Sequence, residues 1–222
     1  IYALCHIKDI TGSEYFPKFV HGLSGGIDSS VVGALLVEAF GSNRLVGINM
    51  PSSYNSEKTK NIARDVAKNL GIIYEILPIN EISDLNKVII DRIDFDGSKR
   101  KISTENFENI QAKIRGTTII SNSAAKYNAL FTNNGNKLEI ALGYATLYGD
   151  FGGAIAPIGD LTKTEVVELA KYLNEEIFKS EVIPNTLIPD ELWNFREDQV
   201  YPSAELREKQ IDPMKFGYHC AL

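Results

Sequence analysis

Apolar residues in the first part of the chain recur with two periods, one typical of buried strands and one typical of helices. Residues 19–23 have the short, mostly apolar character of a buried strand, and apolar residues then recur at helical spacing from Val32 to Phe40. Gly41 follows at once, where glycine commonly ends a helix. The pattern therefore predicts a strand over 19–23 and a helix that ends near Phe40.

Further strands and helices follow in alternation. Apolar runs over 44–50 and 72–78 predict two more buried strands. The helix between them carries one apolar stripe and is closed by Gly71; the stripe consists of Ile62, Val66 and Leu70. Residues 82–89 indicate another helix. This alternation predicts an α/β fold, a doubly wound parallel sheet flanked by helices, as in Rossmann-like proteins.

The second half of the chain is less regular. Residues 91–105 are charged and aperiodic, which predicts a mobile loop. Three elements are expected next: a long helix over 106–128, a strand over 129–134 and a helix over 137–147. Thr162, with Glu165 three residues later, has the pattern of a capping box at the start of a further helix. Residues 175–213 are expected to be irregular.

Composition and charge narrow the class of protein. The 222 residues are 44% hydrophobic and 23% charged, so we expect one globular domain over 1–222. The sequence begins at Ile1 and ends in mid-pattern, which leaves open a domain truncated at both ends. A net charge of −6 argues against general binding to nucleic acid or anionic membrane. No apolar run approaches the roughly 20 residues that span a bilayer.

The cysteines and histidines show no site of their own. Cys5 and Cys220 lie near opposite ends and make no disulfide or metal framework, so a reduced, cytoplasmic setting is expected. The three histidines show no metal-ligand spacing and are expected to be structural; they are His6, His21 and His219.

The stretch SGGIDSS, residues 24–30, lies between the first strand and the first helix and has the composition of a phosphate-binding loop. Gly25 and Gly26 let backbone N–H groups approach an anion at the positive end of the helix. The lysine of a Walker A loop is absent, so transfer of a γ-phosphoryl group is poorly supported. Asp28 would repel phosphates unless Mg²⁺ lay between them. The alternative is a plain helix N-terminus with capping residues.

Four later segments, in order, decide among families that share such a loop. They are ENIQAKIRGT (108–117), GNKLEIALGYATLYGD (135–150), APIGDLTKTEV (156–166) and YPSAELRE (201–208). SGGIDSS resembles the SGGxDS loop of N-type ATP pyrophosphatases. With the four segments, residues 20–213 resemble the synthetase domain of NAD synthetases, in the version usually fused to a glutaminase domain.

The resemblance implies two sets of binding residues. ATP would contact Gly22, Leu23, Ser24, Gly25, Gly26, Ile27, Asp28, Ser29, Asn134, Lys163 and Ser203. Deamido-NAD would contact Asn109, Lys113, Glu139, Tyr144, Ala145, Thr146, Leu147, Tyr148 and Asp150. Asp28 and Glu139 would hold Mg²⁺, and together with Lys163 they would be the catalytic residues.

Several of these residues also have plainer explanations. Lys163 lies in the first turn of a predicted helix, where a cation costs about 0.3–1 kcal/mol and contact with a triphosphate would justify it. Glu139 starts a helix, where a carboxylate is favourable for structure alone. Lys113 alternates with apolar positions, as on a solvated helix face. The tyrosines would otherwise be ordinary core or surface residues.

The sequence also departs from the family pattern. Ammonia-dependent members have an arginine at the position of Lys113 and a lysine at that of Leu147. A threonine is usual where Asn134 stands, and GNKLE replaces the commoner GNKSE. The family continues past residue 222 with basic residues that contact the substrate.

The implied reaction is an ATP-dependent amidation of deamido-NAD to NAD. The nicotinate carboxylate would attack the α-phosphorus of ATP, releasing pyrophosphate and forming an NAD-adenylate, from which ammonia would displace AMP. The ammonia would be free or supplied by a glutaminase domain or subunit, and a homodimer is implied. Two alternatives are another ATP-pyrophosphatase amidotransferase, such as a GMP synthetase, and a non-catalytic nucleotide-binding module.

Overall fold

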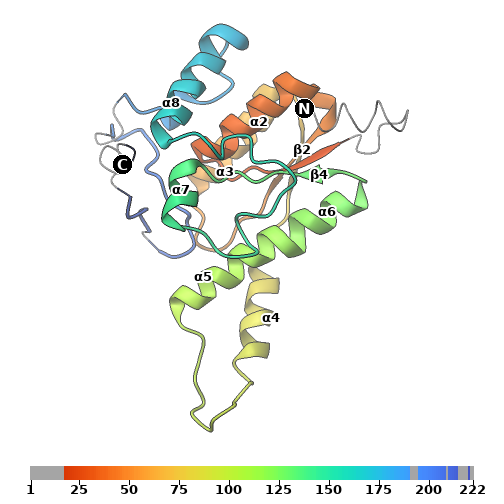
Figure 1. Cartoon of the computed structure of the whole chain (residues 1–222), viewed down its shortest axis with the longest axis vertical. Coiled ribbons are helices and arrows are strands. Elements are labelled where there is room, and N and C mark those ends of the chain that lie inside the picture. Colours follow the sequence, from red (N-terminus) through yellow and green to blue (C-terminus); the bar gives the residue numbers. More distant parts are fainter. Residues whose placement is uncertain (1–17, 191–194, 209, 215–219, 221–222) are drawn as a thin grey trace.

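A parallel sheet forms the centre of the protein. The computed structural model describes residues 18–190, 195–208, 210–214 and 220. Its strands are β1 (Phe19–Gly22), β2 (Leu45–Asn49), β3 (Ile73–Ile76) and β4 (Leu130–Phe131), and they lie in the order β3-β2-β1-β4. All neighbouring pairs are parallel. Helices lie on both faces of the sheet (Figure 1), and the predicted doubly wound α/β fold is confirmed.

The connecting helices follow the predicted order. They are α2 (Ile27–Phe40), α3 (Glu57–Leu70), α4 (Asn80–Ile90), α5 (Thr104–Lys113), α6 (Ser121–Lys126), α7 (Lys137–Leu142) and α8 (Lys163–Tyr172). Two short 3₁₀ helices, η1 (Ser42–Arg44) and η4 (Asn185–Leu187), and two π-helical segments, η2 (Ile114–Ile120) and η3 (Leu173–Ile177), complete the set. Within the described residues, no helix combines the length and apolar character that crossing a bilayer requires.

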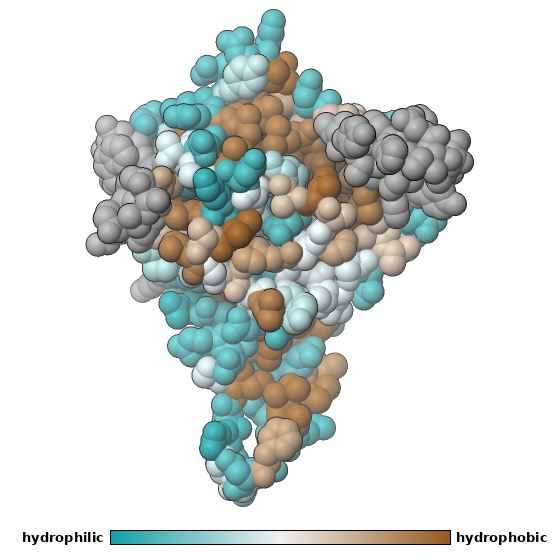
Figure 2. Space-filling model, viewed as in Figure 1, coloured by the Kyte–Doolittle hydropathy of each residue, from teal (hydrophilic) through white to brown (hydrophobic). Residues whose placement is uncertain are grey.

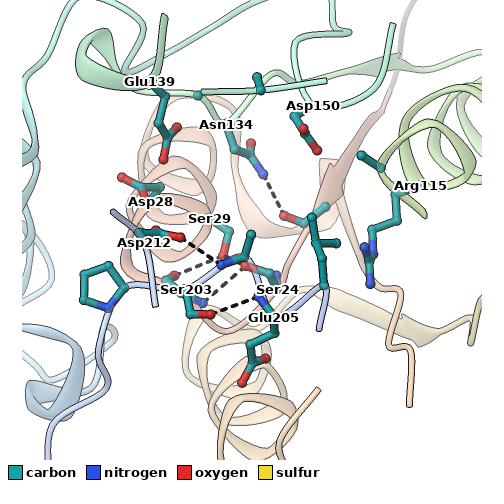
Figure 3. A pocket seen from close by; sticks show the side chains of 18 of the residues that line it. Ser24, Asp28, Ser29, Arg115, Asn134, Glu139, Asp150, Ser203, Glu205 and Asp212 are labelled. Carbon is teal, nitrogen blue, oxygen red and sulfur yellow. Dashed lines mark hydrogen bonds between the residues drawn. The ribbon is translucent and has the colours of Figure 1, made fainter. Parts of the chain in front are cut away.

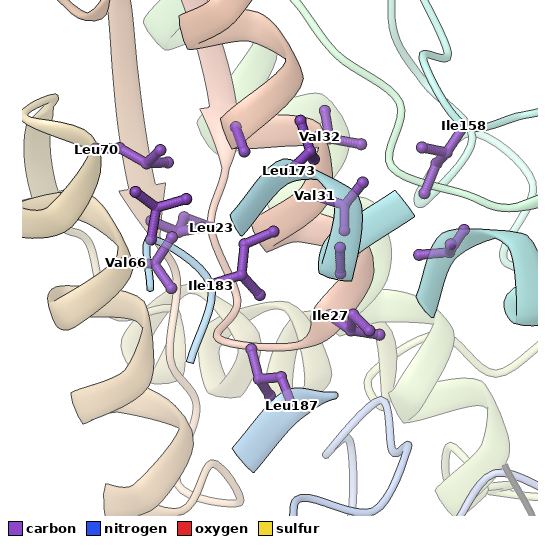
Figure 4. Packing of buried hydrophobic residues seen from close by; sticks show 14 of the residues in the cluster. Leu23, Ile27, Val31, Val32, Val66, Leu70, Ile158, Leu173, Ile183 and Leu187 are labelled. Carbon is purple, nitrogen blue, oxygen red and sulfur yellow. The ribbon is translucent and has the colours of Figure 1, made fainter. Parts of the chain in front are cut away.

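The strand period of two divides the core between the two faces of the sheet. Phe19 and Leu23 point to one face, where they pack with residues of α2, α3 and α8 such as Val31, Val66 and Val166. Figure 4 shows Leu23, Val31 and Val66 within this cluster. Val20 points to the opposite face, where a smaller cluster includes residues of η2 and α6. The glycine loop that leaves β1 is thus supported by packed helices on both sides.

His21 occupies the larger core beside Phe19 and is fully buried. Its Nε2 donates to the Ser29 carbonyl at 2.7 Å, and its Nδ1 lies 3.0 Å from the Thr132 hydroxyl. Burial lowers the pKa of His21 to about 4, so the imidazole is neutral at physiological pH. These contacts agree with the structural role expected for His21. His6, His219 and Cys5 lie outside the described residues, and Cys220 is a free thiol.

The strand order creates a crevice at one edge of the sheet. β2 and β3 extend the sheet to one side of β1, whereas β4 adds to the other side. The chain therefore leaves the carboxyl ends of β1 and β4 in opposite directions. In doubly wound sheets, ligands bind in the crevice between two such strand ends. SGGIDSS follows β1, and the GNK turn follows β4.

Several predicted elements differ in extent from those of the structure. The helix expected over 137–147 ends at Leu142, because Gly143 adopts a left-handed φ of +66° and caps α7. The strand expected over 129–134 pairs only at Leu130 and Phe131. The loop expected over 91–105 is shorter, because Ser103 caps α5 and helix begins at Thr104. The long helix expected over 106–128 is continuous to Lys126 but contains the π segment η2.

Candidate active site

A cavity of about 560 Å³ lies at the carboxyl edge of the sheet. Its wall includes residues from SGGIDSS and from all four later motifs. The predicted site residues in this wall are Gly22, Leu23, Ser24, Gly26, Ile27, Asp28, Ser29, Asn109, Asn134, Glu139, Tyr144, Ala145, Thr146, Asp150, Lys163 and Ser203. The wall does not include Gly25, Lys113, Leu147 or Tyr148. Motifs far apart in the sequence thus form one concave site.

The glycine loop presents an open helix N-terminus to this cavity. α2 begins at Ile27, and no side chain caps it. The Ser29 hydroxyl donates to the Gly26 carbonyl at 3.0 Å and lies 3.0 Å from the Ser24 hydroxyl. The Ser24 hydroxyl accepts from the Gly26 backbone N–H at 3.3 Å, but α2 has no side-chain cap at its N-terminus, which favours the phosphate-binding interpretation over a capped helix start. The positive end of α2 is directed at the cavity, as an anion site requires.

Gly25 has a separate, steric role. Its φ is +88°, and a Cβ at this position would lie 2.1 Å from the Thr59 carbonyl oxygen of α3. Only glycine allows this close approach of two backbones. Gly25 therefore seats the loop against α3 and lies outside the cavity wall.

Lys163 and Asp28 form an ion pair in the wall of the cavity. Lys163, the first residue of α8, is only 3% exposed, and its ammonium contacts the Asp28 carboxylate. Burial alone would lower the pKa of Lys163, but the charges of Asp28 and Glu139 outweigh it and raise the pKa above its ordinary value. The lysine is therefore a permanently charged group beside the glycine loop. Thr162 and Glu165 form the predicted capping box before it.

Glu139 caps its own helix and also lies beside Asp28 in the cavity wall. It forms a capping box with Asn136, whose backbone N–H donates to the Glu139 carboxylate at 3.1 Å. Asn136 Nδ2 also donates to Asp28 Oδ1 at 3.4 Å, so this residue touches both carboxylates. Burial, together with the charge of Asp28, raises the pKa of Glu139 to about 7. The two acidic groups thus share one site and repel each other.

This pair of carboxylates fits a hard divalent cation with incomplete protein ligation. Among the described residues, no group of three or more His, Cys, Asp or Glu side chains could hold a metal ion. Asp28 and Glu139 could supply two oxygen ligands, and Mg²⁺ commonly takes its others from substrate phosphates and water. Burial and then the charge of Asp28 raise the pKa of Glu139, and a bound cation would favour its ionised form.

The opposite wall holds the residues expected to face a dinucleotide. The Thr146 hydroxyl donates to Asn109 Oδ1 at 2.7 Å, and the Thr146 backbone N–H donates to Asp150 at 3.0 Å. Tyr144 donates to Asp212 at 3.3 Å. These bonds tie the 144–150 loop to α5 and to the C-terminal segment. Lys113, Leu147 and Tyr148 are exposed on the outside of this wall.

Five charged residues in the wall are absent from the predicted site: Glu105, Glu108, Arg115, Glu205 and Asp212. Arg115 donates through Nε to the Met50 carbonyl at 3.0 Å, and burial lowers its pKa to about 10. Glu205 and Asp212 come from the irregular C-terminal segment (Figure 3). Arg115 lies in ENIQAKIRGT and Glu205 lies in YPSAELRE, so their positions in these motifs could have indicated both. Asp212 had no such signal, because no periodic element surrounds it.

Comparisons with known proteins agree on a family. The NAD synthase family model matches residues 3–221. A glutamine-dependent NAD(+) synthetase from Synechocystis sp. is 39% identical over 198 residues, which are 89% of this chain and 32% of that protein. This chain spans about a third of the length of the curated relatives it matches.

Solved structures show the same fold. The glutamine-dependent NAD+ synthetase from Acinetobacter baumannii, in complex with ADP, has a TM-score of 0.69 at 32% identity and is matched over 86% of this chain and 34% of that chain. The NMN synthetase from Francisella tularensis has a TM-score of 0.74 at 26% identity, over 95% of this chain and 76% of that chain.

Proposed function

Because the chain belongs to the NAD synthase family, we propose that its cavity binds ATP and deamido-NAD and joins ammonia to the nicotinate carboxyl group. The reaction consumes ATP, deamido-NAD and ammonia and yields NAD, AMP and pyrophosphate. The observation that carries the proposal is the meeting of the open α2 N-terminus, Lys163 and the Asp28–Glu139 pair in one cavity. The Acinetobacter baumannii relative was solved in complex with ADP, which supports nucleotide binding by this chain.

In the first step the nicotinate carboxylate attacks the α-phosphorus of ATP. A phosphorus–oxygen bond forms to the carboxylate, the bond to the β-phosphate breaks, and pyrophosphate leaves with the electron pair. The backbone N–H groups at the start of α2 and the Lys163 ammonium would stabilise the leaving charge. The Lys163 ammonium has three N–H donors, so it could contact a phosphate while it pairs with Asp28. No side-chain nucleophile is required.

In the second step ammonia attacks the acyl carbon of the adenylate and AMP leaves. The protein contributes positioning, because an adenylate is already an activated acyl donor. Asn109, Thr146 and Asp150 hold one another through hydrogen bonds and would keep the nicotinate end in place. Their mutual bonds make this wall preorganised before any substrate arrives.

The residues Asp28 and Glu139 would hold Mg²⁺ between them and the phosphates of ATP. The ion would supply positive charge that screens the approach of an anionic carboxylate to an anionic phosphate. The protein's part is to keep the two carboxylates in one site, which Asn136 does by contacting both.

The nitrogen source is ammonia, either free or released from glutamine. The Synechocystis relative named above is glutamine-dependent, and it is about three times as long as this chain. We therefore expect ammonia to reach this cavity from a glutaminase domain or subunit when glutamine is the donor. Assays with ammonium and with glutamine in parallel distinguish the two sources.

A second candidate substrate is nicotinate mononucleotide. The NMN synthetase of Francisella tularensis matches 95% of this chain, so the fold alone fits a smaller substrate equally well. The chemistry at the α-phosphorus of ATP would be the same. The substrate would lack only the AMP half of deamido-NAD. Offering deamido-NAD, nicotinate mononucleotide and xanthosine monophosphate with ATP and ammonium, and identifying the amidated product, tests the proposal. NAD as the main product would support deamido-NAD as the substrate. NMN or GMP as the main product would contradict it.

We also propose that the protein acts as a homodimer. α4 and the segment 91–103 form an arm that projects from the domain (Figure 1), and apolar side chains gather on its surface (Figure 2). Leu85, Val88 and Phe95 are 59%, 50% and 96% exposed there. Exposed apolar surfaces of this kind mark contacts with other proteins.

A further inference from the structure

Glu205 has an unusual backbone and a carboxylate with three partners. Its φ of +48° is left-handed, a conformation that glutamate rarely adopts. The carboxylate points toward α3 (Figure 3) and accepts hydrogen bonds from the Thr59 hydroxyl at 2.8 Å and from Asn55 Nδ2 at 2.9 Å. The backbone N–H of Ser56, the N-cap of α3, donates to it at 3.4 Å. The carboxylate thus occupies the positive end of α3.

The same segment carries Ser203 into the cavity wall. The backbone N–H of Glu205 donates to the Ser203 hydroxyl oxygen at 3.1 Å. No described residue accepts a hydrogen bond from that hydroxyl, so its proton is left for a ligand in the cavity that it shares with Ser24 and Asp28. The direction of the Ser203 side chain therefore depends on the backbone of Glu205.

The anchor on α3 is also the support of the glycine loop. The turn of α3 that holds the Glu205 carboxylate contains Thr59, and the Thr59 carbonyl is the atom against which Gly25 packs. One turn of helix therefore carries SGGIDSS on one side and the 203–205 segment on the other. The spacing between the glycine loop and Ser203 is set through this turn.

We propose that Glu205 is a positioning residue for the bound nucleotide: its carboxylate locks the 203–205 segment to α3 so that the Ser203 hydroxyl faces the phosphates held by SGGIDSS. The inference rests on the proposed function, because it takes ATP as the ligand beside Ser203. It explains why a glutamate occupies a strained left-handed position, since three donors at the start of α3 compensate for the strain.

The test measures the affinity of the magnesium complex of α,β-methylene-ATP, which cannot release pyrophosphate, by titration calorimetry. We expect Glu205→Ala to bind it about tenfold more weakly than the unmodified protein, because an oriented hydrogen-bonding group is lost. Ser203→Ala should weaken binding by itself but add little in the Glu205→Ala background, since the contact is already lost there. Glu208→Ala, an exposed acid on the same segment, is the matched control and should bind normally.

Two further variants separate positioning from folding. Glu205→Gly relieves the left-handed backbone and removes the carboxylate, so it should fold well and still bind weakly. Thr59→Val removes one donor to the carboxylate from outside the segment and should weaken binding in the same direction. Normal affinity in Glu205→Gly, or additive losses with Ser203→Ala, would overturn the inference while leaving the proposed function intact. An unmodified protein that fails to bind the analogue would overturn both.

Discussion

Three carboxylates surround the ammonium group of Lys163, and one lysine compensates them only in part. Asp28 pairs with Lys163 directly, while Glu139 and Asp212 also act on its pKa. Burial, reinforced by the charge of Asp28, raises the pKa of Glu139 to about 7, and burial raises that of Asp212 as well. Negative charge is therefore unfavourable in the ligand-free site, and a bound cation would stabilise it.

This charge balance predicts a stabilising substitution at a proposed metal ligand. The folded-state pKa of Glu139 is about 7, above its ordinary value of 4.5, so ionisation of this group destabilises the fold as pH rises between these values. We expect ligand-free Glu139→Gln to melt at a higher temperature than the unmodified protein above pH 7. The difference should shrink as pH falls toward 4.5, as measured by thermal denaturation across this range.

Glu165→Gln is the matched control, and it should change the melting temperature in the opposite direction. Glu165 occupies the same capping-box position in α8, but it is exposed, and hydrogen bonds from Thr162 lower its pKa. Its ionised form therefore stabilises the fold above pH 4.5, and Glu165→Gln should lower the melting temperature there. A Glu139→Gln variant that is less stable at pH 8, or a difference that does not change with pH, would show that Glu139 is not held under electrostatic strain.

At the scale of elements, the π segment η2 brings two backbones into contact beside the predicted dinucleotide wall. A Cβ on Gly116 would lie 2.3 Å from the Gly149 carbonyl oxygen. π-helical turns widen the helix locally and often occur at functional sites. The 144–150 loop can therefore approach α5 only because position 116 has no side chain.

Gly116→Ala should accordingly act on one substrate more than on the other. The new methyl group must push the 144–150 loop away from Ala112 and Asn109, whereas the glycine loop lies elsewhere. We expect the KM for deamido-NAD to rise about tenfold or more, with the KM for ATP changed less than twofold. Steady-state kinetics with each substrate varied in turn measures both. Asn122→Ala, an exposed change further along on α6, should alter neither, and equal rises in both KM values would contradict the assignment of this wall.

Local patterns predicted those elements whose signals lie within their own residues. The stripe of Ile62, Val66 and Leu70 is buried on α3 as expected, and Gly71 ends that helix with a φ of +65°. The π segment could not be predicted, because it accompanies a contact with Gly149, which is distant in sequence. The early end of α7 was missed because the apolar residues after Gly143 continue a helical pattern, although that glycine turns the chain.

At the scale of the molecule, the arm formed by α4 and residues 91–103 exposes apolar side chains that the proposed dimer would cover. Its apolar side chains face outward over one side of the projection (Figure 2). We predict that Val88→Glu, at a position 50% exposed on α4, shifts the protein from dimer to monomer in light-scattering chromatography. Leu142→Glu, equally exposed on α7, should leave the mass unchanged. A wild-type protein that is monomeric at every concentration would contradict the proposed dimer.

The location of the site could be predicted from the sequence, but the contacts within it could not. SGGIDSS and the GNK turn each follow a strand, so their meeting at the carboxyl edge follows from the topology. The resemblance supplied Lys163 and Glu139, which the structure places in the cavity with Asp28. Arg115, Glu205 and Asp212 owe their positions to hydrogen bonds and charges between distant segments, and no local pattern encodes these. Whether the exposed residues Lys113, Leu147 and Tyr148 contact substrate stays a prediction.

Attack of the nicotinate carboxylate on the α-phosphorus of ATP would transfer one carboxylate oxygen atom to AMP. Deamido-NAD labelled with ¹⁸O in both carboxylate oxygens is incubated with the protein, ATP, Mg²⁺ and ammonium, and the products are analysed by mass spectrometry. Attack at the α-phosphorus predicts one ¹⁸O atom in the phosphate of AMP and the other in the amide of NAD. Label in inorganic phosphate, with ADP as the second product, would mean attack at the γ-phosphorus and would contradict this prediction.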